Sequence, residues 1–370
     1  MGYFEFIQRA ALEKNHSAVI AWLLSNSNKY LSDKQKKNIL KELFGVETDT
    51  DTIEVYTEYK GIDILFVIGN NIIAIENKIK IGEHDNQLDI YNSILKKDFP
   101  EHYILNKFFL SLIGEKPIDD QWNILTYDEI LDCIKPYSKQ SEIINDYIQN
   151  LIKLVGVKNK FNEDHSKFPN VFSDGSKRKN EKIDKYKYSD DLNYISSNNL
   201  ETIFQRYFFY KIMDKMDNMD NMNFKCKIKK VGETRGAALI DIKNPDQLPN
   251  IKINGSVIDI GIQIQGNTIK IQFENGFDEN GNRKKQDPNL LKVLNNNIGN
   301  IYNLVDKNEW RLNKPKTANS AYYSISKKIE FMSGVSFADN DFENCINSVK
   351  KEYQKCIEIL KKIRITIASS

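Results

Sequence analysis

The sequence predicts an α/β domain, with a mixed central sheet flanked by helices, followed by an α+β accessory domain. Apolar residues recur at helical spacing before about residue 44, and β-branched runs with strand character follow them. After about residue 192, strand and helix patterns mix again. The chain has 370 residues, 40% of them hydrophobic and 28% charged, which suits two domains with substantial cores.

The first 44 residues read as two helical stretches. Residues 3–24 place Phe6, Val19 and Leu23 at helical spacing. A polar break at 25–28 separates this stretch from a second helix over about 33–44.

Three strands are expected next. Residues 53–59 alternate with period two, whereas 62–68 and 72–76 are almost continuously apolar, as in strands covered on both faces. Gly69 and Asn70 between the last two predict a tight hairpin, because glycine adopts the positive φ that such turns need.

The remaining elements of the first half alternate between classes. We expect helices over 84–97, 127–134 and 142–154, and strands over 106–113 and 122–125. A polar segment over 158–191 reads as a linker or long loop, and its basic run Lys177-Arg178-Lys179 is better explained by solvation than by phosphate binding. The predicted divisions are therefore 1–157, 158–191 and 192–370.

The second half matches no motif. We expect helices over 201–216, 289–304 and 342–363, and strands over 224–231, 237–242, 257–264 and 268–273. Aromatic and basic residues interleave at 205–211, 283–285 and 310–311, where they either bind nucleic acid or, as we favour, belong to the core. Selecting the target, binding a partner and forming a homo-oligomer all remain open for this domain.

Composition excludes several classes of protein. A net charge of +2 does not indicate a polyanion partner, so any nucleic-acid surface must be local. The four cysteines form no CxxC pair and indicate free thiols in a reducing compartment. No signal peptide or bilayer-length apolar run is visible, so we expect a cytoplasmic protein that does not contact a membrane.

One constellation carries chemistry. If Gly69-Asn70 is the turn, Ile68 pairs with Asn71 and Asp63 lies opposite Glu76. Side chains alternate along a strand, so Lys78 shares the face of Glu76.

Two opposed carboxylates repel each other and resist burial unless positive charge compensates them. A divalent cation does this, and Mg²⁺ suits two carboxylates, Asp63 and Glu76, together with the backbone carbonyl of Asn77 and substrate phosphate. Lys78 would orient a water molecule or offset charge on the phosphate. The alternative is an ordinary salt bridge at the end of a sheet, but the apolar strands around it make an unneeded charge costly.

These residues resemble a known signature. Asp63, a gap of twelve residues and then Glu76-Asn77-Lys78 are similar to the motif of the PD-(D/E)XK nuclease superfamily, although Ile62 stands where a proline is usual. The order of elements also resembles that superfamily's core. The resemblance implies a PD-(D/E)XK-like fold and Mg²⁺-dependent cleavage, with Mn²⁺ as a substitute.

Two further elements strengthen the resemblance. Gln87 and Tyr91, four residues apart on one helical face, look like the Q-x-x-x-Y element of exonuclease-like members, which implies contact with the substrate. For Tyr91, core packing is an equal alternative. Glu13, His16 and Ser17 resemble the E-x-x-H-S opening of a bacterial stand-alone branch, which implies that Glu13 lies near the metal and that the other two brace the site.

We therefore expect a metal-dependent nuclease acting on DNA, with Asp63, Glu76, Lys78, Glu13 and Gln87 in its active site. Roles that are common in that superfamily suggest defence against foreign DNA or repair. Two alternatives stay open, namely an RNA nuclease and a non-catalytic binding protein that retains the fold.

Overall fold

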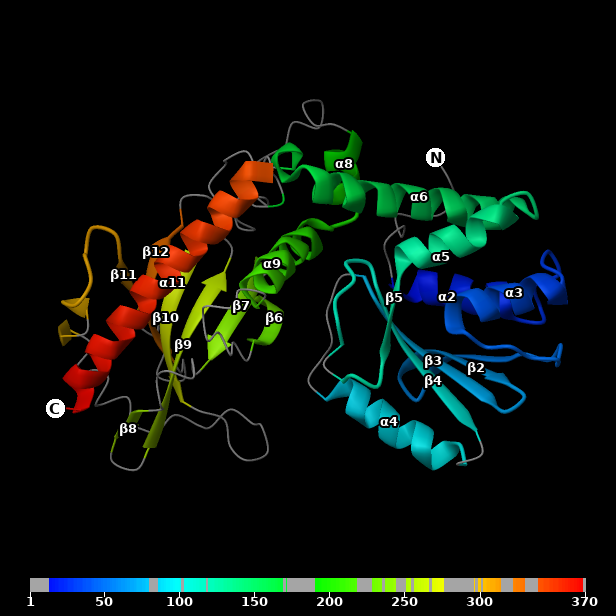
Figure 1. The fold of residues 1–370 in the computed structure, drawn as a ribbon, viewed down its shortest axis with the longest axis horizontal. Coiled ribbons are helices and arrows are strands. Elements are labelled where there is room, and N and C mark those ends of the chain that lie inside the picture. The colour runs from blue at the N-terminus through cyan, green and yellow to red at the C-terminus, as the bar shows by residue number, and fades with distance from the viewer. Residues whose placement is uncertain are drawn as a thin grey trace. The chain divides into compact units, whose positions relative to one another are not determined.

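A computed structural model describes most of the chain (Figure 1). The described residues are 13–79, 86–100, 103–117, 119–168, 171, 190–217, 228–234, 237–243, 251–253, 256–265, 268–275, 296, 299–300, 302–313, 322–329 and 339–368. The chain divides into two compact units, one of residues 1–163 and 184–203 and the other of 164–183 and 204–370. Every helix within these described ranges is too short or too polar to cross a lipid bilayer.

The N-terminal unit is built on a five-stranded mixed sheet in the order β1-β2-β3-β4-β5. Its strands are β1 (Glu54–Tyr59), β2 (Ile62–Ile68), β3 (Asn71–Lys78), β4 (Ile104–Ser111) and β5 (Asn123–Thr126). The first three pair antiparallel, and β3, β4 and β5 pair parallel. The predicted α/β class is confirmed.

Helices cover both faces of this sheet (Figure 1). The helices of this unit are α2 (Glu13–Leu24), α3 (Asp33–Phe44), α4 (Gln87–Asp98), α5 (Tyr127–Ile134), the short 3-10 helix η1 (Lys135–Tyr137), α6 (Glu142–Glu163) and α8 (Asp190–Ser197). On one face α4 packs Leu88 and Leu95 against Leu65 and Ala74. On the other, Phe44 of α3 contacts Phe66 and Phe108, with ring centroids 6.3 and 5.1 Å apart.

Helix α6 extends well beyond the expected end at residue 154. Val157 and Phe161 continue its buried stripe, and Lys158 is buried with its ammonium paired to Asp128. Lys158, which the sequence suggested to be solvated, is therefore a buried residue of α6. Residues 158–163 of the expected linker are helical. The run Lys177–Lys179 lies outside the described residues.

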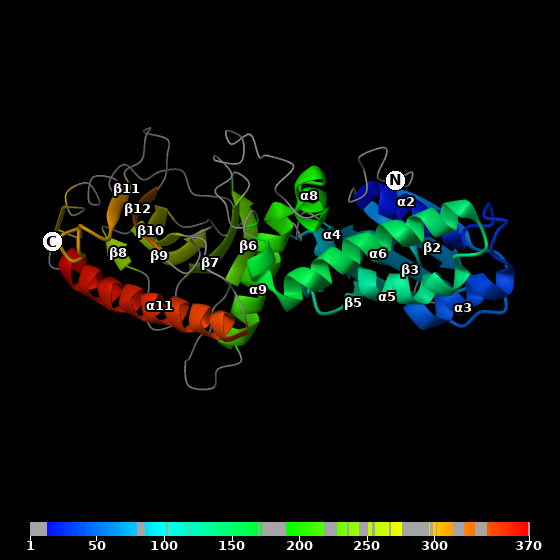
Figure 2. The same ribbon diagram turned by 90° about the horizontal axis from the view of Figure 1, so that it is seen from above.

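The second unit contains a seven-stranded antiparallel sheet in the order β11-β12-β10-β9-β7-β6, with β8 beside β9. Its elements are η2 (His165–Lys167), α9 (Glu201–Asp217, which begins in the first unit), β6 (Ile228–Thr234), β7 (Ala237–Lys243), β8 (Ile251–Ile253), β9 (Ser256–Gln265), β10 (Thr268–Asn275), β11 (Arg311–Asn313), β12 (Tyr322–Lys328) and α11 (Asp339–Ala368). Figure 2 shows α11 running along this sheet. Strands β8, β11 and β12 were not expected.

Several expectations about the second half can be compared with the structure. The strands expected over 257–264 and 268–273 are β9 and β10, which pair antiparallel with Gln265 opposite Thr268. Phe208 and Phe209 of α9 are buried core residues, as is Trp310, whereas Tyr207 and Tyr210 are half-buried. Most of the helix expected over 289–304, the start of the strand expected at 224 and the basic run 283–285 lie outside the described residues.

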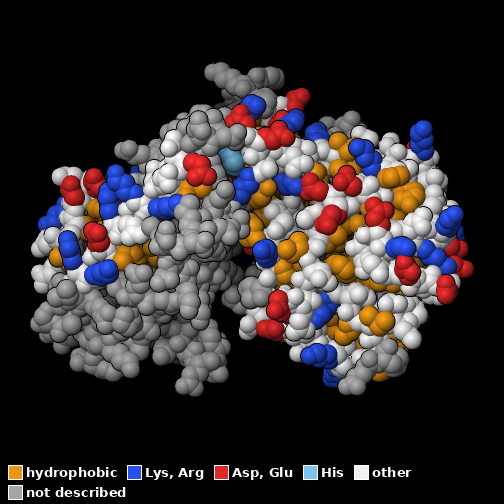
Figure 3. All heavy atoms as spheres, viewed as in Figure 1, with side chains coloured by type: hydrophobic (Ala, Val, Ile, Leu, Met, Phe, Trp, Pro, Cys, Tyr) orange, Lys and Arg blue, Asp and Glu red, His pale blue; other side chains and the backbone are white. Residues whose placement is uncertain are grey.

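The cysteines fit the expectation of free thiols where they are described. Cys133 and Cys356 are free and buried, and burial raises the pKa of the Cys133 thiol to about 12. Cys226 and the side chain of Cys345 lie outside what the structure describes. On the face shown in Figure 3, lysine and arginine side chains alternate with carboxylates over the N-terminal unit, in keeping with the small net charge.

Candidate active site

The β2–β3 hairpin has the predicted register. Gly69 has a φ of 56°, Ile68 pairs with Asn71 and Ile64 pairs with Ile75. Extending this register by one residue places Asp63 opposite Glu76, and Asp63 lies close enough to raise the pKa of Glu76. Residues directly opposite each other in an antiparallel pair project to the same face, so both carboxylates lie on the face that α4 covers.

Both carboxylates and Lys78 are held in a largely buried setting. Glu76 is 1% exposed and Lys78 is 9% exposed. The Lys78 Nζ lies 2.5 Å from Glu76 Oε1. Glu76 Oε2 is buried and has no hydrogen-bond partner among the described residues. The Asp63 Oδ2 accepts a 2.7 Å hydrogen bond from the backbone N–H of Asn77.

The pKa shifts of the two carboxylates indicate that Lys78 alone does not offset their negative charge. Burial raises the pKa of Glu76 to about 8, and the neighbouring Asp63 adds to the effect, while Lys78 opposes it. Burial also raises the pKa of Asp63, against the Asn77 N–H and the charge of Lys78. One lysine therefore does not compensate the two carboxylates.

The donor set fits a hard divalent cation. The buried Glu76 carboxylate, with one oxygen that has no hydrogen-bond partner, and the half-buried Asp63 carboxylate offer ligands that Mg²⁺ prefers, and Mg²⁺ usually keeps several of its waters. Within the described part of the chain, no group of three or more His, Cys, Asp or Glu side chains is arranged to hold a metal ion. The site thus offers an open set of ligands in which Asp63 and Glu76 supply the charge.

Glu13 reaches the end of β3 from the first turn of α2. Its Oε1 accepts a 2.7 Å hydrogen bond from the backbone N–H of Ile79, the residue after Lys78. Its negative charge contributes to the raised pKa of Asp63. The structure therefore brings Glu13 close to Asp63 and to the end of β3, and its place near a metal ion stays a prediction.

The side chain of Asn77 connects β3 to two helices, a role that the sequence did not reveal. Its Nδ2 donates to Ser17 Oγ and to the Glu13 carbonyl, each at 3.0 Å. Its Oδ1 accepts a 2.6 Å hydrogen bond from the hydroxyl of Tyr127, the first residue of α5. The only available signal was that a polar residue in a buried strand needs partners.

His16 lies within the same buried region. Its Nδ1 is 3.2 Å from the Tyr147 hydroxyl, and its ring meets the Tyr127 ring edge-on at 5.1 Å between centroids. His16 and Ser17 therefore lie next to the side chains that hold Asn77, on the opposite face of the sheet from Glu76. This position agrees with a bracing role.

Gln87 and Tyr91 are joined to each other and to β2. Gln87 Nε2 donates to the Tyr91 hydroxyl at 2.7 Å, and that hydroxyl donates to the Gly61 carbonyl at 2.6 Å. Gly61 has a φ of 96°, and a Cβ there would lie 3.4 Å from the Tyr91 ring. Tyr91 is 6% exposed, and its pKa is raised to about 12, chiefly by burial and next by the charge of Glu76. It therefore fixes the turn that leads to Asp63.

Comparison with known families agrees with this geometry. A sequence model described as the PD-(D/E)XK nuclease superfamily matches residues 1–205, more than half of the 370 residues. No curated protein and no solved structure matches the chain. The matched range contains the five-stranded sheet with its flanking helices, together with Asp63, Glu76 and Lys78. The chain belongs to the PD-(D/E)XK nuclease superfamily.

Proposed function

We propose that this protein is a Mg²⁺-dependent nuclease that hydrolyses phosphodiester bonds in DNA. The observation that carries the proposal is the close approach of two carboxylates, the half-buried Asp63 and the buried Glu76, whose Oε2 has no hydrogen-bond partner. Holding two like charges on one buried face costs folding free energy. A site that binds a cation and a phosphate accounts for that cost, whereas a structural salt bridge requires only one carboxylate.

Asp63 and Glu76 would hold the metal ion, and the backbone carbonyl of Asn77 is our candidate for a further ligand. When bound, Mg²⁺, or Mn²⁺ in its place, polarises the scissile phosphate and lowers the pKa of a water molecule. Lys78 orients the attacking water and offsets negative charge that develops on the phosphate.

Three other residues support this chemistry. Glu13 holds the N–H of Ile79 and so fixes the backbone beside Lys78. Tyr91 holds the turn before β2 through Gly61. Gln87 donates one N–H to Tyr91 and has a second N–H to offer a phosphate oxygen of the substrate.

A cleavage assay tests the proposal. Purified protein is incubated with supercoiled plasmid, linear duplex and single-stranded RNA, each with Mg²⁺ or with EDTA. We expect Mg²⁺-dependent loss of DNA and a decrease of at least about a hundredfold in Lys78→Ala, the scale on which one electrostatic contact to a transition state acts. Lys34→Ala, at an exposed position of α3, is the matched control and should cleave like wild type.

The other outcomes are informative. Cleavage of RNA with intact DNA would replace the proposed substrate. Full activity in EDTA, or in Lys78→Ala, would contradict the proposed chemistry, and no cleavage of any polymer would favour a binding protein with this fold. The biological setting, defence against foreign DNA or repair, rests on family habit rather than on these residues.

A further inference from the structure

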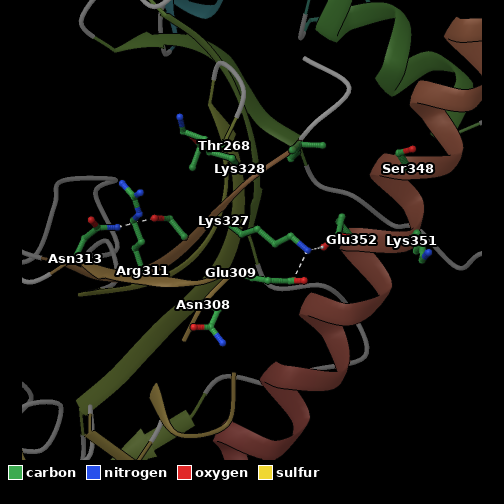
Figure 4. A pocket seen from close by; sticks show the side chains of 12 residues that line it. Thr268, Asn308, Glu309, Arg311, Asn313, Lys327, Lys328, Ser348, Lys351 and Glu352 are labelled. Carbon is green, nitrogen blue, oxygen red and sulfur yellow. Dashed lines mark hydrogen bonds and ion pairs between the residues drawn. The ribbon is translucent and has the colours of Figure 1, made fainter. Parts of the chain in front are cut away.

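The second unit contains a polar pocket that the proposed cleavage chemistry does not use. Its volume is about 800 Å³, and it lies where β11 and β12 meet α11 (Figure 4). Four cations line it, Arg311, Lys327, Lys328 and Lys351, together with two carboxylates, Glu309 and Glu352.

Both carboxylates are already engaged by one lysine. Lys327 Nζ lies 2.6 Å from Glu309 and 3.2 Å from Glu352, and these contacts raise the pKa of Lys327 against the effect of burial. Glu352 is also 3.0 Å from Lys355. No described carboxylate pairs with the three remaining cations of the lining. The pocket therefore presents excess positive charge.

Two of those cations share one face of the sheet. Arg311 of β11 pairs with Ser326 of β12, and Lys328 lies two residues further along the same strand. Because side chains alternate, Arg311, Ser326 and Lys328 project to one side. Lys327 projects to the other side, toward Glu352 of α11 (Figure 4), and because Lys327 and Glu352 also line the pocket, the lining takes residues from both sides of β12.

Neutral donors surround this cationic face. Asn313 donates to Ser326 Oγ at 2.8 Å and to Ser324 Oγ at 3.2 Å, which holds its amide beside Arg311 on the same face. Thr268 of β10 pairs with Lys328 and adds a hydroxyl. A guanidinium, an ammonium and hydroxyl groups form a donor set suited to phosphate, while both amide hydrogens of Asn313 are already used within the lining.

We propose that this pocket binds the phosphate groups of a nucleic-acid strand. Among the described residues of the lining there is no aromatic side chain and one aliphatic one, Ile329, so none of these residues offers a ring on which a base could stack. That composition favours the polymer backbone over a free nucleotide, whose base would go unrecognised. The volume, within the usual range for ligand sites, holds more than one phosphate group. The inference goes beyond the cleavage site because it gives the second unit its own contact with nucleic acid.

Fluorescence anisotropy of the full-length chain tests it. A fluorescein-labelled single-stranded DNA is titrated at several salt concentrations in EDTA, so that the result does not depend on cleavage. The test variant is Arg311→Ala with Lys328→Ala, two exposed positions. The matched control is Lys361→Ala with Lys362→Ala, which removes the same charge from exposed positions of α11 outside the pocket.

We expect the test variant to bind about tenfold more weakly than wild type. The slope of log affinity against log salt should decrease by roughly 1.4, because each phosphate contact on a single strand contributes about 0.7. The control should keep the wild-type affinity and slope, and all three proteins should have equal thermal midpoints.

Two results would overturn the inference. One is a test variant that binds DNA as the control does. The other is a fluorescent ATP analogue that binds wild type but not the test variant, while both proteins bind DNA equally, because the pocket would then be a nucleotide site. Both results can be interpreted even if the protein shows no cleavage in the nuclease assay, because the binding assay does not depend on cleavage.

Discussion

The Tyr127 hydroxyl donates a 2.6 Å hydrogen bond to Asn77 Oδ1, although the two residues lie 50 positions apart in the chain. Asn77 stands between Glu76 and Lys78 and projects to the opposite face of β3. The two proposed catalytic side chains on one face are thus held in place by a hydrogen bond on the other. Tyr127 is a positioning residue in this arrangement and does not face the substrate.

Removing this contact should lower stability in a coupled way. Asn77→Ala leaves the buried Tyr127 hydroxyl without its acceptor and removes the hydrogen bonds from the Asn77 amide to Ser17 Oγ and to the Glu13 carbonyl, so we expect a loss of about 3 kcal/mol in the free energy of unfolding. Tyr127→Phe should cost about 1–2 kcal/mol, since Asn77 keeps its other bonds. Urea denaturation of both single variants and the double variant gives the coupling. Additive losses, within about 0.5 kcal/mol, would contradict a direct interaction.

Glu76→Gln should separate stability from metal binding. Burial and the neighbouring Asp63 raise the pKa of Glu76 to about 8, which costs wild type stability above the unfolded-state pKa of 4.5. Glutamine does not titrate, so at pH 7 in EDTA the variant should be more stable than wild type by about 1–3 kcal/mol. Saturating Mg²⁺ should stabilise wild type by at least about 1.4 kcal/mol at tenfold over the dissociation constant, but leave the variant unchanged. Thermal unfolding with Mg²⁺ and with EDTA measures both effects.

Glu163→Gln, at an exposed position near the end of α6, is the control for that experiment and should behave like wild type. If Mg²⁺ stabilised Glu76→Gln as much as wild type, Glu76 would not be a ligand.

Two substitutions at Glu13 distinguish its charge from its hydrogen bond. Glu13→Gln keeps an oxygen acceptor for the Ile79 N–H, so we expect wild-type stability and a several-fold higher Mg²⁺ requirement for cleavage. Glu13→Ala leaves that N–H without its acceptor and should also cost about 1–2 kcal/mol of stability. Urea denaturation and Mg²⁺ titration of the cleavage rate measure the two effects. Equal stability of both variants would show that the bond to Ile79 contributes little.

His165 predicts a pH dependence of the second unit's stability. Burial lowers the pKa of His165 to about 4, the nearby Lys211 adds to this and Asp164 opposes it. Its ring lies 5.3 Å from that of Phe208. The unfolded chain binds a proton near pH 6.5 and the folded chain only near pH 4, so stability is complete above pH 6.5 and falls as pH drops toward 4.

The loss across that window should reach about 3 kcal/mol at most. Urea denaturation between pH 7 and 4 measures it, with His165→Gln as the variant that should lose this part of the dependence. The chain has four histidines, so NMR can follow each imidazole separately. A His165 resonance that titrates near pH 6.5 would contradict the prediction.

The parts of the site that local pattern determines were predictable from sequence. The Gly69-Asn70 turn fixes the pairing of β2 with β3, and pairing fixes which side chains face each other. Helical spacing likewise placed Gln87 beside Tyr91. In the first case a single hairpin turn joins the two strands, and in the second case a single helical turn separates the two residues.

The contacts that the sequence did not reveal join distant segments. Nothing near Asn77 indicates that Tyr127 donates to it, because the two meet only when α5 packs on the sheet. The short strand β11 was missed because its three residues show no alternating apolar pattern of their own. The extension of α6 was missed because Lys158 finds its partner, Asp128, on another helix.

The pairing of β2 with β3 also limits how this gene can change in length. Asp63 and Glu76 point to the same side of the sheet only while the number of residues between each carboxylate and the turn stays even or stays odd, as it is now. An in-frame insertion or deletion of one codon within either strand, between a carboxylate and the turn, would send one carboxylate to the far side of the sheet. An insertion or deletion of two codons within a strand, or a change confined to the loop, would leave both carboxylates on the same side. Natural variants of this hairpin should therefore differ in strand length by even numbers of residues.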